Sequence, residues 1–519
     1  MGTWELLEES SEVAAVHAAL LPNGEVVYYS GNTGPEIPAD TRIWNPQERT
    51  VRPAPNAPDT DLFCNGLTLL WDGRLFVAGG TAKYSEGPGD PWFGSNAAYR
   101  FDPFAGWERI EDMAFGRWYP SAVALPDGRV LVMGGEGGAE VNGARTEQAE
   151  VYSLFNGWEV LPASASRYLP LYPRLHVLAS GELLCAGQGA ATAIFNLDTM
   201  EWREIAPAEP PPMGGGSGTG PGRQPRRGAG RKPSSRGARA RPAGRTVGAQ
   251  HEGHEEQPAP PPSRPAPPPH WHDHRPGSVG PRPDDLSVLV GPAQAMKVLN
   301  AGGGDPATTR AQIMDLSEDA PVWRQIAPMN YGRWFPNSVL LPDGTLFVAG
   351  GGLIYNAEPV MESEIFDPVS ETWTLDAPMS VPRLYHSTAL LLPDGRVWMA
   401  GTDGETRIEV YSPDYLFAGP RPILFIAPES VTYGQQFPIP MADPGDVADA
   451  CFIRLSAVTH AFNMGQRYVP LEIAVTGPDE LQVTAPSDPF VAPPGHYMLF
   501  IRNQAGVPAE APIILLVVT

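Results

Sequence analysis

Side chains that can hold a redox metal recur at one position of a repeated sequence phrase. The position nine residues before the glycine of a predicted turn is occupied by Cys64, Tyr119 and His386 in three copies of the phrase, and Tyr385 precedes His386. Thiol, phenol and imidazole groups together are donor types that copper uses in proteins. If the copies converge in space, these four side chains form a candidate copper site.

Each of these residues also has a simpler explanation. A single cysteine in a β-rich core is usually an inert small hydrophobe, which is our interpretation of Cys185 and Cys451. Two further copies carry Tyr172 and Phe335 at the same position, and we interpret both as packing residues. A lone histidine is more often a hydrogen-bonded core residue than a ligand. Spacing by itself leaves metal binding and packing about equally open, and the combination of residue types favours metal binding.

The elements that would position these residues are short β-strands. The phrase consists of an apolar run, a turn that usually reads D-G or N-G, a second apolar run and usually a Gly-Gly pair, which predicts two strands joined by a hairpin. Complete copies span residues 16–31, 63–80, 118–135, 171–189, 334–351 and 384–402, and a degraded copy ends at 295–304. Further strands follow each copy, as in "AEVYSL" and "GWEVL".

The spacing of the copies decides the fold class. Once one insertion is removed the period is about 50 residues, close to that of kelch repeats, and unrelated hairpins in a sandwich would not keep it. We therefore predict an all-β chain with a seven-bladed kelch-type β-propeller. In a propeller the first strand of each blade lines the axis, so residues at its start converge at one end of the channel.

Three boundaries between parts of the chain follow from the amino-acid composition and from the pattern of apolar residues. Residues 208–283 are rich in Pro, Gly and Arg with few aliphatic side chains, which predicts a disordered insertion. The insertion separates blades 1–4 (residues 1–207) from blades 5–7 (residues 284–418). Residues 419–519 show short alternating strands without the Gly-Gly phrase and predict an immunoglobulin-like β-sandwich.

The net charge and the apolar runs of the chain argue against some classes of partner. The formal net charge of −23 argues against nucleic acid and against anionic membrane surfaces. No apolar run is long enough to span a bilayer, and the first residues show no signal peptide. We expect a monomer.

Several phrases carry a resemblance to a known family. "FCNG", "GRWYPSAVALPDGRVLVMGG", "RLYHSTALLLPDGRV", "AVTHAFNMGQR" and "PPGHYMLF" resemble the copper radical oxidases, the galactose oxidase and glyoxal oxidase family, over nearly the whole chain outside the insertion. Several of the phrases are closer to the glyoxal oxidase branch. The resemblance implies a seven-bladed propeller followed by a sandwich domain, from which a loop brings one histidine to the axis. "VTHAFNMGQR" fits that loop and makes His460 the ligand.

The resemblance also implies a cofactor and a reaction. It implies one copper ion with equatorial ligands Tyr119, His386 and His460 and axial Tyr385, and a thioether bond between Cys64 and Tyr119 that forms a tyrosyl-radical cofactor. In the family scheme Tyr385 takes the substrate proton, the Tyr119 radical abstracts hydrogen from carbon, and dioxygen leaves as hydrogen peroxide. The implied substrates are primary alcohols, small aldehydes or carbohydrates, and the implied location is extracellular.

The sequence also departs from the family pattern. Galactose oxidase stacks an indole over the cross-linked tyrosine from a loop that here reads "GGEGGAEVNGAR", without tryptophan. Trp92 and Tyr84, in the loop "TAKYSEGPGDPWFG", are our candidates to cover the site and line the substrate. This departure, the insertion and the missing signal peptide keep a second hypothesis open. It is a non-catalytic kelch propeller that binds carbohydrate or protein at its loop face.

Overall fold

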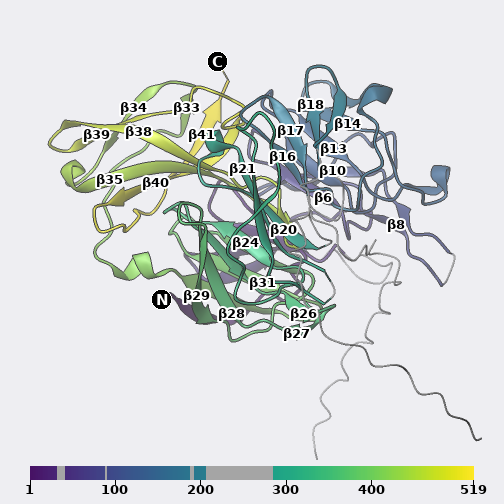
Figure 1. Cartoon of the computed structure of the whole chain (residues 1–519), viewed down its shortest axis with the longest axis horizontal. Coiled ribbons are helices and arrows are strands. Elements are labelled where there is room, and N and C mark those ends of the chain that lie inside the picture. Colours follow the sequence, from purple (N-terminus) through teal and green to yellow (C-terminus); the bar gives the residue numbers. More distant parts are fainter. Residues whose placement is uncertain (32–40, 88–89, 187–191, 206–283, 305, 519) are drawn as a thin grey trace, which may run out of the picture. The chain divides into compact units, whose positions relative to one another are not determined.

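Each copy of the repeated phrase forms the two inner strands of a four-stranded antiparallel sheet (Figure 1). The structure, a computed structural model, describes residues 1–31, 41–87, 90–186, 192–205, 284–304 and 306–518. Seven such sheets follow one another, and inner strand β2 of the first blade contacts inner strand β30 of the last. The predicted seven-bladed β-propeller is confirmed. The predicted insertion at 208–283 lies outside the described residues.

The strands of each blade are given from the innermost outward. They are β2 (His17–Leu20), β3 (Val26–Tyr29), β4 (Arg42–Asn45) and β5 (Thr50–Pro53) in blade 1; β6 (Gly66–Leu69), β7 (Leu75–Ala78), β10 (Ala98–Asp102) and β11 (Gly106–Arg109) in blade 2; β12 (Ser121–Ala124), β13 (Val130–Met133), β14 (Glu150–Ser153) and β15 (Gly157–Val160) in blade 3; β16 (Leu175–Val177), β17 (Glu182–Cys185), β18 (Ala193–Asn196) and β19 (Glu201–Glu204) in blade 4; β20 (Asp285–Val290), β21 (Lys297–Gly302), β22 (Ala311–Asp315) and β23 (Arg324–Gln325) in blade 5; β24 (Asn337–Leu340), β25 (Leu346–Ala349), β28 (Glu362–Asp367) and β29 (Thr372–Pro378) in blade 6; and β30 (Ser387–Leu391), β31 (Val397–Gly401), β32 (Arg407–Ser412) and β1 (Thr3–Ser10) in blade 7.

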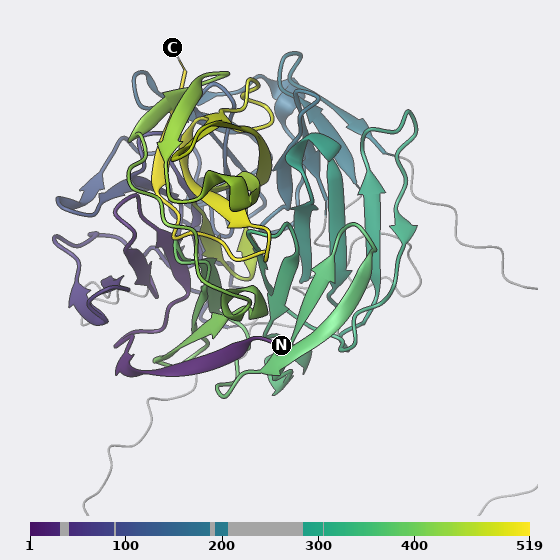
Figure 2. The same ribbon diagram turned by 90° about the vertical axis from the view of Figure 1, so that its left-hand side faces the viewer.

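The outer strand of blade 7 comes from the other end of the propeller sequence. Strand β1 pairs antiparallel with β32, with Trp4 opposite Tyr411 (Figure 2). The indole of Trp4 also donates to the carbonyl of Ala377 in blade 6, at 3.0 Å. The first ten residues therefore close the ring of blades, a role that the repeat pattern does not reveal.

The Gly-Gly pairs at the ends of the second strands let successive blades touch. The amide of Gly80 donates to the carbonyl of Arg117 in the next blade at 3.0 Å, and the amide of Gly351 donates to that of Arg383 at 2.7 Å. A Cβ atom on Gly79 would lie 2.4 Å from the Arg117 carbonyl oxygen. The pair is glycine because any side chain there would push the blades apart.

The three arginines that precede strands β12, β24 and β30 hold equivalent buried ion pairs. Arg117 pairs with Glu150, Arg333 with Glu364 and Arg383 with Glu409, and all six side chains are fully buried. Each arginine also donates to the carbonyl of a glycine at the end of the second strand of its own blade, Gly134, Gly350 or Gly401. These ion pairs therefore fix the position along the axis at which the inner strand begins in blades 3, 6 and 7.

The C-terminal residues form the predicted sandwich. Its strands, in chain order, are β33 (Ser430–Thr432), β34 (Gln436–Pro440), β35 (Val447–Arg454), β38 (Tyr468–Gly477), β39 (Glu480–Thr484), β40 (Gly495–Asn503) and β41 (Ile513–Val517). The first half of β38 pairs with β35 and its second half pairs with β39. Strand β38 thereby passes from one sheet to the other and joins the two layers.

A long hairpin leaves this domain between β35 and β38 and enters the propeller. Its strands β36 (Ala457–Thr459) and β37 (Phe462–Asn463) extend blade 1, because β36 pairs antiparallel with β2. Two further hairpins rise from the blades, β8 (Thr81–Lys83) with β9 (Phe93–Gly94) in blade 2 and β26 (Gly352–Ile354) with β27 (Ala357–Pro359) in blade 6.

Helical structure is confined to short 3-10 turns at Ala139–Val141, Ala163–Ala165, Ala293–Ala295, Asp414–Phe417 and Pro444–Asp446 in the part of the chain that the structure describes. Among those residues, no helix has the length and apolar character needed to cross a membrane.

Candidate copper centre

The residues predicted to converge share an unusual backbone conformation. Cys64, Tyr119, Tyr172, Phe335 and His386 have φ angles of 65°, 63°, 45°, 53° and 64°. This left-handed region is uncommon for residues other than glycine, and such outliers cluster at functional sites. The conformation is held between blades, because the amide of Tyr119 donates to the carbonyl of Cys64 and the amide of Tyr172 donates to that of Tyr119, each at 2.8 Å.

Blade 7 brings two side chains to this ring where other blades bring one. One residue separates the buried Arg117 from Tyr119 and Arg333 from Phe335, whereas two separate Arg383 from His386. The arginine lies eleven residues before the turn glycine in blades 3 and 6 but twelve before Gly395 in blade 7, so blade 7 has one extra residue between its arginine and its hairpin turn. Tyr385 and His386 both face the site for this reason.

Four of the predicted residues, joined by His460, form one buried cluster. The metal-binding atoms of Cys64, His386 and His460 lie within 4.8 Å of one another. The hydroxyl groups of Tyr119 and Tyr385 are hydrogen-bonded to each other. The ring of His460 lies 4.7 Å from that of Tyr119 and 5.3 Å from that of Tyr385, measured between centroids. All five sequence-predicted residues are therefore neighbours.

Hydrogen bonds orient both histidines toward the same space. Nδ1 of His386 lies 2.5 Å from Oδ1 of Asp403, and its Nε2 is buried without a hydrogen-bond partner. The hydroxyl of Thr459 donates to the carbonyl of Val16 and therefore accepts from Nδ1 of His460, at 2.6 Å. Each imidazole thus carries its proton on Nδ1 and presents the Nε2 lone pair, the form in which a histidine binds a metal.

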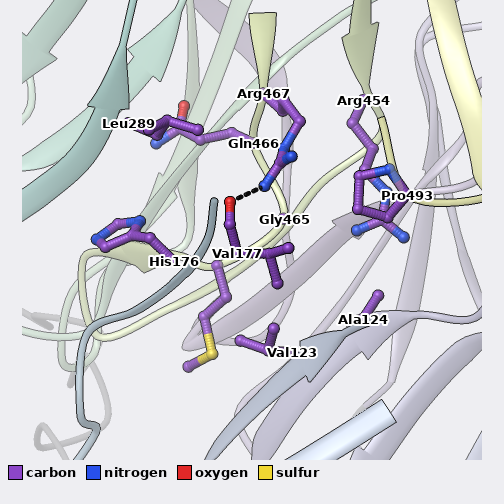
Figure 3. A pocket seen from close by; sticks show the side chains of 11 residues that line it. Val123, Ala124, His176, Val177, Leu289, Arg454, Gly465, Gln466, Arg467 and Pro493 are labelled. Atoms are coloured by element: carbon purple, nitrogen blue, oxygen red, sulfur yellow. Dashed lines mark hydrogen bonds between the residues drawn. The ribbon is translucent and has the colours of Figure 1, made fainter. Parts of the chain in front are cut away.

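The long hairpin brings His460 to the site. Figure 3 shows the base of this hairpin, where Arg467 donates to the carbonyl of Val177 in blade 4 at 2.6 Å. Arg454, on the other strand of the base, donates to the carbonyl of Leu69 in blade 2. The sandwich is therefore attached to two blades where the hairpin enters the channel.

The cavity drawn in Figure 3 is separate from the candidate centre. It has a volume of about 10 Å³ and is lined by the ends of β12 and β16 at Ala124 and Val177, whereas the cluster lies at the starts of the inner strands. A cavity of this size holds about one water molecule. It is too small for an organic substrate.

Burial sets the protonation of the site. Burial raises the pKa of Tyr119 and that of Tyr385 well above the usual value, and the charge of Cys64 adds to both increases. Burial, with smaller contributions from His386, His17 and Arg174, lowers the pKa of His460 well below the usual value. At neutral pH and without a metal, the tyrosines are neutral phenols and His460 is a neutral ligand.

Trp92 and Tyr84 lie beside the cluster, next to Trp118. Both belong to the β8–β9 hairpin, and their rings are 5.1 Å apart. The indole of Trp92 stacks on that of Trp118 at 4.5 Å with an interplanar angle of 8°, and Trp118 in turn meets the ring of Tyr119 at 4.4 Å. Their role as substrate-lining residues stays a prediction.

The two residues interpreted as packing residues are buried against the cluster. The ring of Tyr172 lies 4.7 Å from that of His460, and its hydroxyl donates to the carbonyl of Asn65. Phe335 packs on Tyr385 with centroids 4.8 Å apart. Cys185 and Cys451 are buried away from the cluster, and burial raises the pKa of both thiols.

Sequence reasoning missed three residues that touch this cluster. His17 accepts from the amide of Cys64 at 3.3 Å, Asp403 binds His386, and Thr459 binds His460. One feature of the sequence could have identified Asp403. The copy in blade 7 reads "AGTDG" where other copies have Gly-Gly, and Thr402 and Asp403 occupy that departure.

Comparisons with known proteins agree with the fold. A family model described as the glyoxal oxidase N-terminus matches residues 286–416, and one described as a galactose oxidase-like early set domain matches residues 421–516. The aldehyde oxidase GLOX of Vitis pseudoreticulata is 27% identical, over 99% of this chain and 97% of that protein. The galactose oxidase of Gibberella zeae is also 27% identical, over 91% of this chain but 64% of that enzyme.

A solved structure shares the fold. It is a fungal alcohol oxidase of the AA5 family in complex with copper, with a TM-score of 0.74 and 23% identity over 99% of both chains. Fold and comparisons together define a kelch-type propeller with an early set sandwich domain. The chain is similar to glyoxal oxidases and galactose oxidases, which confirms the resemblance carried by its sequence phrases.

Proposed function

We propose that this protein is a copper radical oxidase that converts a primary alcohol or small aldehyde to the next oxidation level and reduces dioxygen to hydrogen peroxide. The observation that carries the proposal is the buried, unpartnered Nε2 atom of His386, which lies among Cys64, His460 and two hydrogen-bonded tyrosines. An unsatisfied buried acceptor is costly unless a partner occupies the site. The names of the relatives, an aldehyde oxidase, a galactose oxidase and an alcohol oxidase, support the same reaction class.

The donor set fits copper. Two neutral imidazoles and two phenols that can ionise on binding give four nitrogen and oxygen ligands, a set that suits Cu(II). We assign the ligands as Tyr119, Tyr385, His386 and His460. The hydrogen bonds of Asp403 and Thr459 already hold both imidazoles in the ligating tautomer.

Cys64 has a different role in this proposal. Burial raises the pKa of Tyr119, and the charge of Cys64 and a side-chain hydrogen bond with Cys64 add to the increase, so the sulfur lies within hydrogen-bonding reach of the phenol oxygen. A thioether forms when the S–H and the ortho C–H bonds are replaced by one S–C bond. The two protons and two electrons released reduce dioxygen to hydrogen peroxide.

A bound copper ion would supply one-electron redox chemistry and a binding position for the substrate oxygen and for dioxygen. The protein residues then divide the remaining work. The oxygen of Tyr385 accepts the substrate hydroxyl proton, and the oxidised, thioether-bearing Tyr119 accepts a hydrogen atom from the adjacent carbon. One proton and one hydrogen atom account for the two hydrogens and one of the two electrons lost when an alcohol becomes an aldehyde, and a bound copper ion would accept the second electron. A small aldehyde reacts as its hydrate in the same way.

The first experiment is peptide mass mapping of protein expressed without copper, before and after aerobic incubation with Cu(II). We expect the peptides that contain Cys64 and Tyr119 to fuse with loss of two hydrogens. The Cys64→Ser variant should bind copper but form no fused peptide and lose nearly all peroxide production, while Cys185→Ser, a buried cysteine outside the cluster, should behave like the wild type.

Two outcomes contradict the proposal. Separate peptides in a copper-loaded protein would mean that the radical cofactor is not made and that Cys64 serves as a thiolate ligand or is inert. Failure to bind copper with one-to-one stoichiometry would favour the alternative of a non-catalytic propeller that binds carbohydrate or protein.

A further inference from the structure

A line of aromatic rings leads from Tyr119 toward the surface. Its successive members are Trp118, Trp92 and Tyr84, with centroid separations of 4.4, 4.5 and 5.1 Å. Trp118 is 1% exposed, whereas Trp92 and Tyr84 are partly exposed. Every member has an oxidisable side chain, and each is in contact with the next.

The outer end of the line has a proton acceptor. The hydroxyl of Tyr84 donates to Oδ2 of Asp61 at 2.6 Å. The other carboxylate oxygen of Asp61 accepts from the amide of Phe63, next to Cys64, at 2.8 Å. A tyrosine that loses an electron also loses its phenolic proton, so a fixed carboxylate at this distance allows Tyr84 to be oxidised and restored without exchanging a proton with solvent.

We propose that Trp118, Trp92 and Tyr84 form a path for single electrons between Tyr119 and the surface of the β8–β9 hairpin. The path lets an external one-electron oxidant of the metal-complex class, such as hexacyanoferrate(III), generate the Tyr119 radical without entering the site. This inference rests on the proposed function, since it requires that Tyr119 is the redox-active residue.

The electron balance is simple. The Tyr119 phenolate loses one electron and becomes a phenoxyl radical, and one hexacyanoferrate(III) becomes hexacyanoferrate(II). No bond is formed or broken overall. Trp118, Trp92 and Tyr84 are each oxidised and reduced once in passing, and the Tyr84 proton moves to Asp61 and returns.

The corresponding position in blade 6 differs in the tyrosine that it reaches. Trp334 stands in the same phrase as Trp118, and its ring centroid lies 4.4 Å from that of Phe335, 4.5 Å from that of Tyr355 and 5.5 Å from that of Tyr385. The rings of blade 6 therefore lead to Tyr385, whereas the tryptophan of blade 3 directly precedes and contacts Tyr119, the residue that carries the radical in the proposed function. The hairpin of blade 2 then continues the line with Trp92 stacked nearly parallel on Trp118.

The test measures radical formation and not turnover. Copper-loaded, cross-linked protein is reduced with ascorbate, freed of reductant and mixed with hexacyanoferrate(III), and the radical is followed by its optical absorption and by loss of the Cu(II) electron paramagnetic resonance signal. We expect Trp118→Phe and Trp92→Phe to slow radical formation about tenfold or more, and Tyr84→Phe to slow it measurably. Trp107→Phe, a buried tryptophan of blade 2 outside the line, is the matched control and should leave the rate unchanged.

The outcomes are separable. Equal rates for the wild type and for the Trp92→Phe and Tyr84→Phe variants would overturn the path while leaving the proposed oxidase intact. These two variants remain decisive if Trp118→Phe fails to fold, because both residues lie on the partly exposed hairpin. A wild-type protein that forms the cross-linked peptide yet gives no radical with the oxidant also overturns the path. One that forms no cross-link overturns the proposed function and this inference together.

Discussion

The imidazole Nδ1 of His386 lies 2.5 Å from Oδ1 of Asp403, a carboxylate on the loop that follows the second strand of the same blade. The contact fixes the orientation of the ring and leaves Nε2 facing Cys64 and His460. Partners of this kind hold ligating histidines in many metal sites, and their loss typically reduces metal affinity 10- to 100-fold.

We therefore expect Asp403→Ala to weaken Cu(II) binding by about 10- to 100-fold. Competition with a chelator of known affinity measures the change directly. Asp403→Asn retains an acceptor oxygen and should lose less. Equal affinities for wild type and Asp403→Ala would show that the contact does not position the ligand.

Copper binding should strengthen with pH across the neutral range. Burial raises the pKa values of Tyr119 and Tyr385, so both are protonated before the metal binds and must release protons to become phenolate ligands. Burial lowers the pKa of His460, which is therefore neutral throughout this range and releases none.

The corresponding measurement is the slope of log affinity against pH between about pH 6 and pH 8. We expect Tyr385→Phe to reduce that slope by about one proton, because one ionising ligand is removed. An unchanged slope would mean that Tyr385 does not bind as a phenolate.

The buried ion pair of blade 6 should matter greatly for stability. Replacing Arg333 by Met leaves the Glu364 carboxylate buried without its cation, which typically costs about 3–5 kcal/mol. Arg324→Met breaks a more exposed pair, which joins β23 of blade 5 to Glu371 of blade 6, and should cost less than about 1 kcal/mol. Urea unfolding of the two variants separates the effects, and similar losses would contradict the assignment.

Acid should destabilise the protein partly through His176. Burial, followed by the charges of Arg467 and Arg174, lowers the pKa of His176 to about 3. The unfolded chain binds a proton near pH 6.5 and the folded chain does not. The stability associated with the neutral ring is therefore complete above pH 6.5 and is lost as pH falls from 6.5 toward 3.

The variant His176→Gln keeps a partner for Ser287 and removes this titration. It should be destabilised at pH 7, but the deficit should shrink by about 2 kcal/mol at pH 5, since wild type loses up to about 1.4 kcal/mol per pH unit below 6.5. Unfolding midpoints in urea at the two pH values provide the comparison. A deficit that does not change with pH would contradict the prediction.

The repeated phrase determined the propeller and the candidate ligands. Its alternating apolar runs, turn glycines and Gly-Gly pairs are local properties, and one blade is largely built from residues close in sequence. Counting from the turn glycine therefore aligned Cys64, Tyr119 and His386 correctly without coordinates. Recognition of His460 needed the family resemblance, because its hairpin belongs to another domain.

Only the tertiary structure decided what surrounds these residues. Strand β1 closes blade 7 from the opposite end of the propeller sequence, and Asp403, Thr459 and His17 reach the cluster from three separate segments. The stack of Trp92 on Trp118 joins blade 2 to blade 3. Such contacts depend on how seven blades close around one axis, and that closure is a cooperative, long-range property that no local pattern contains.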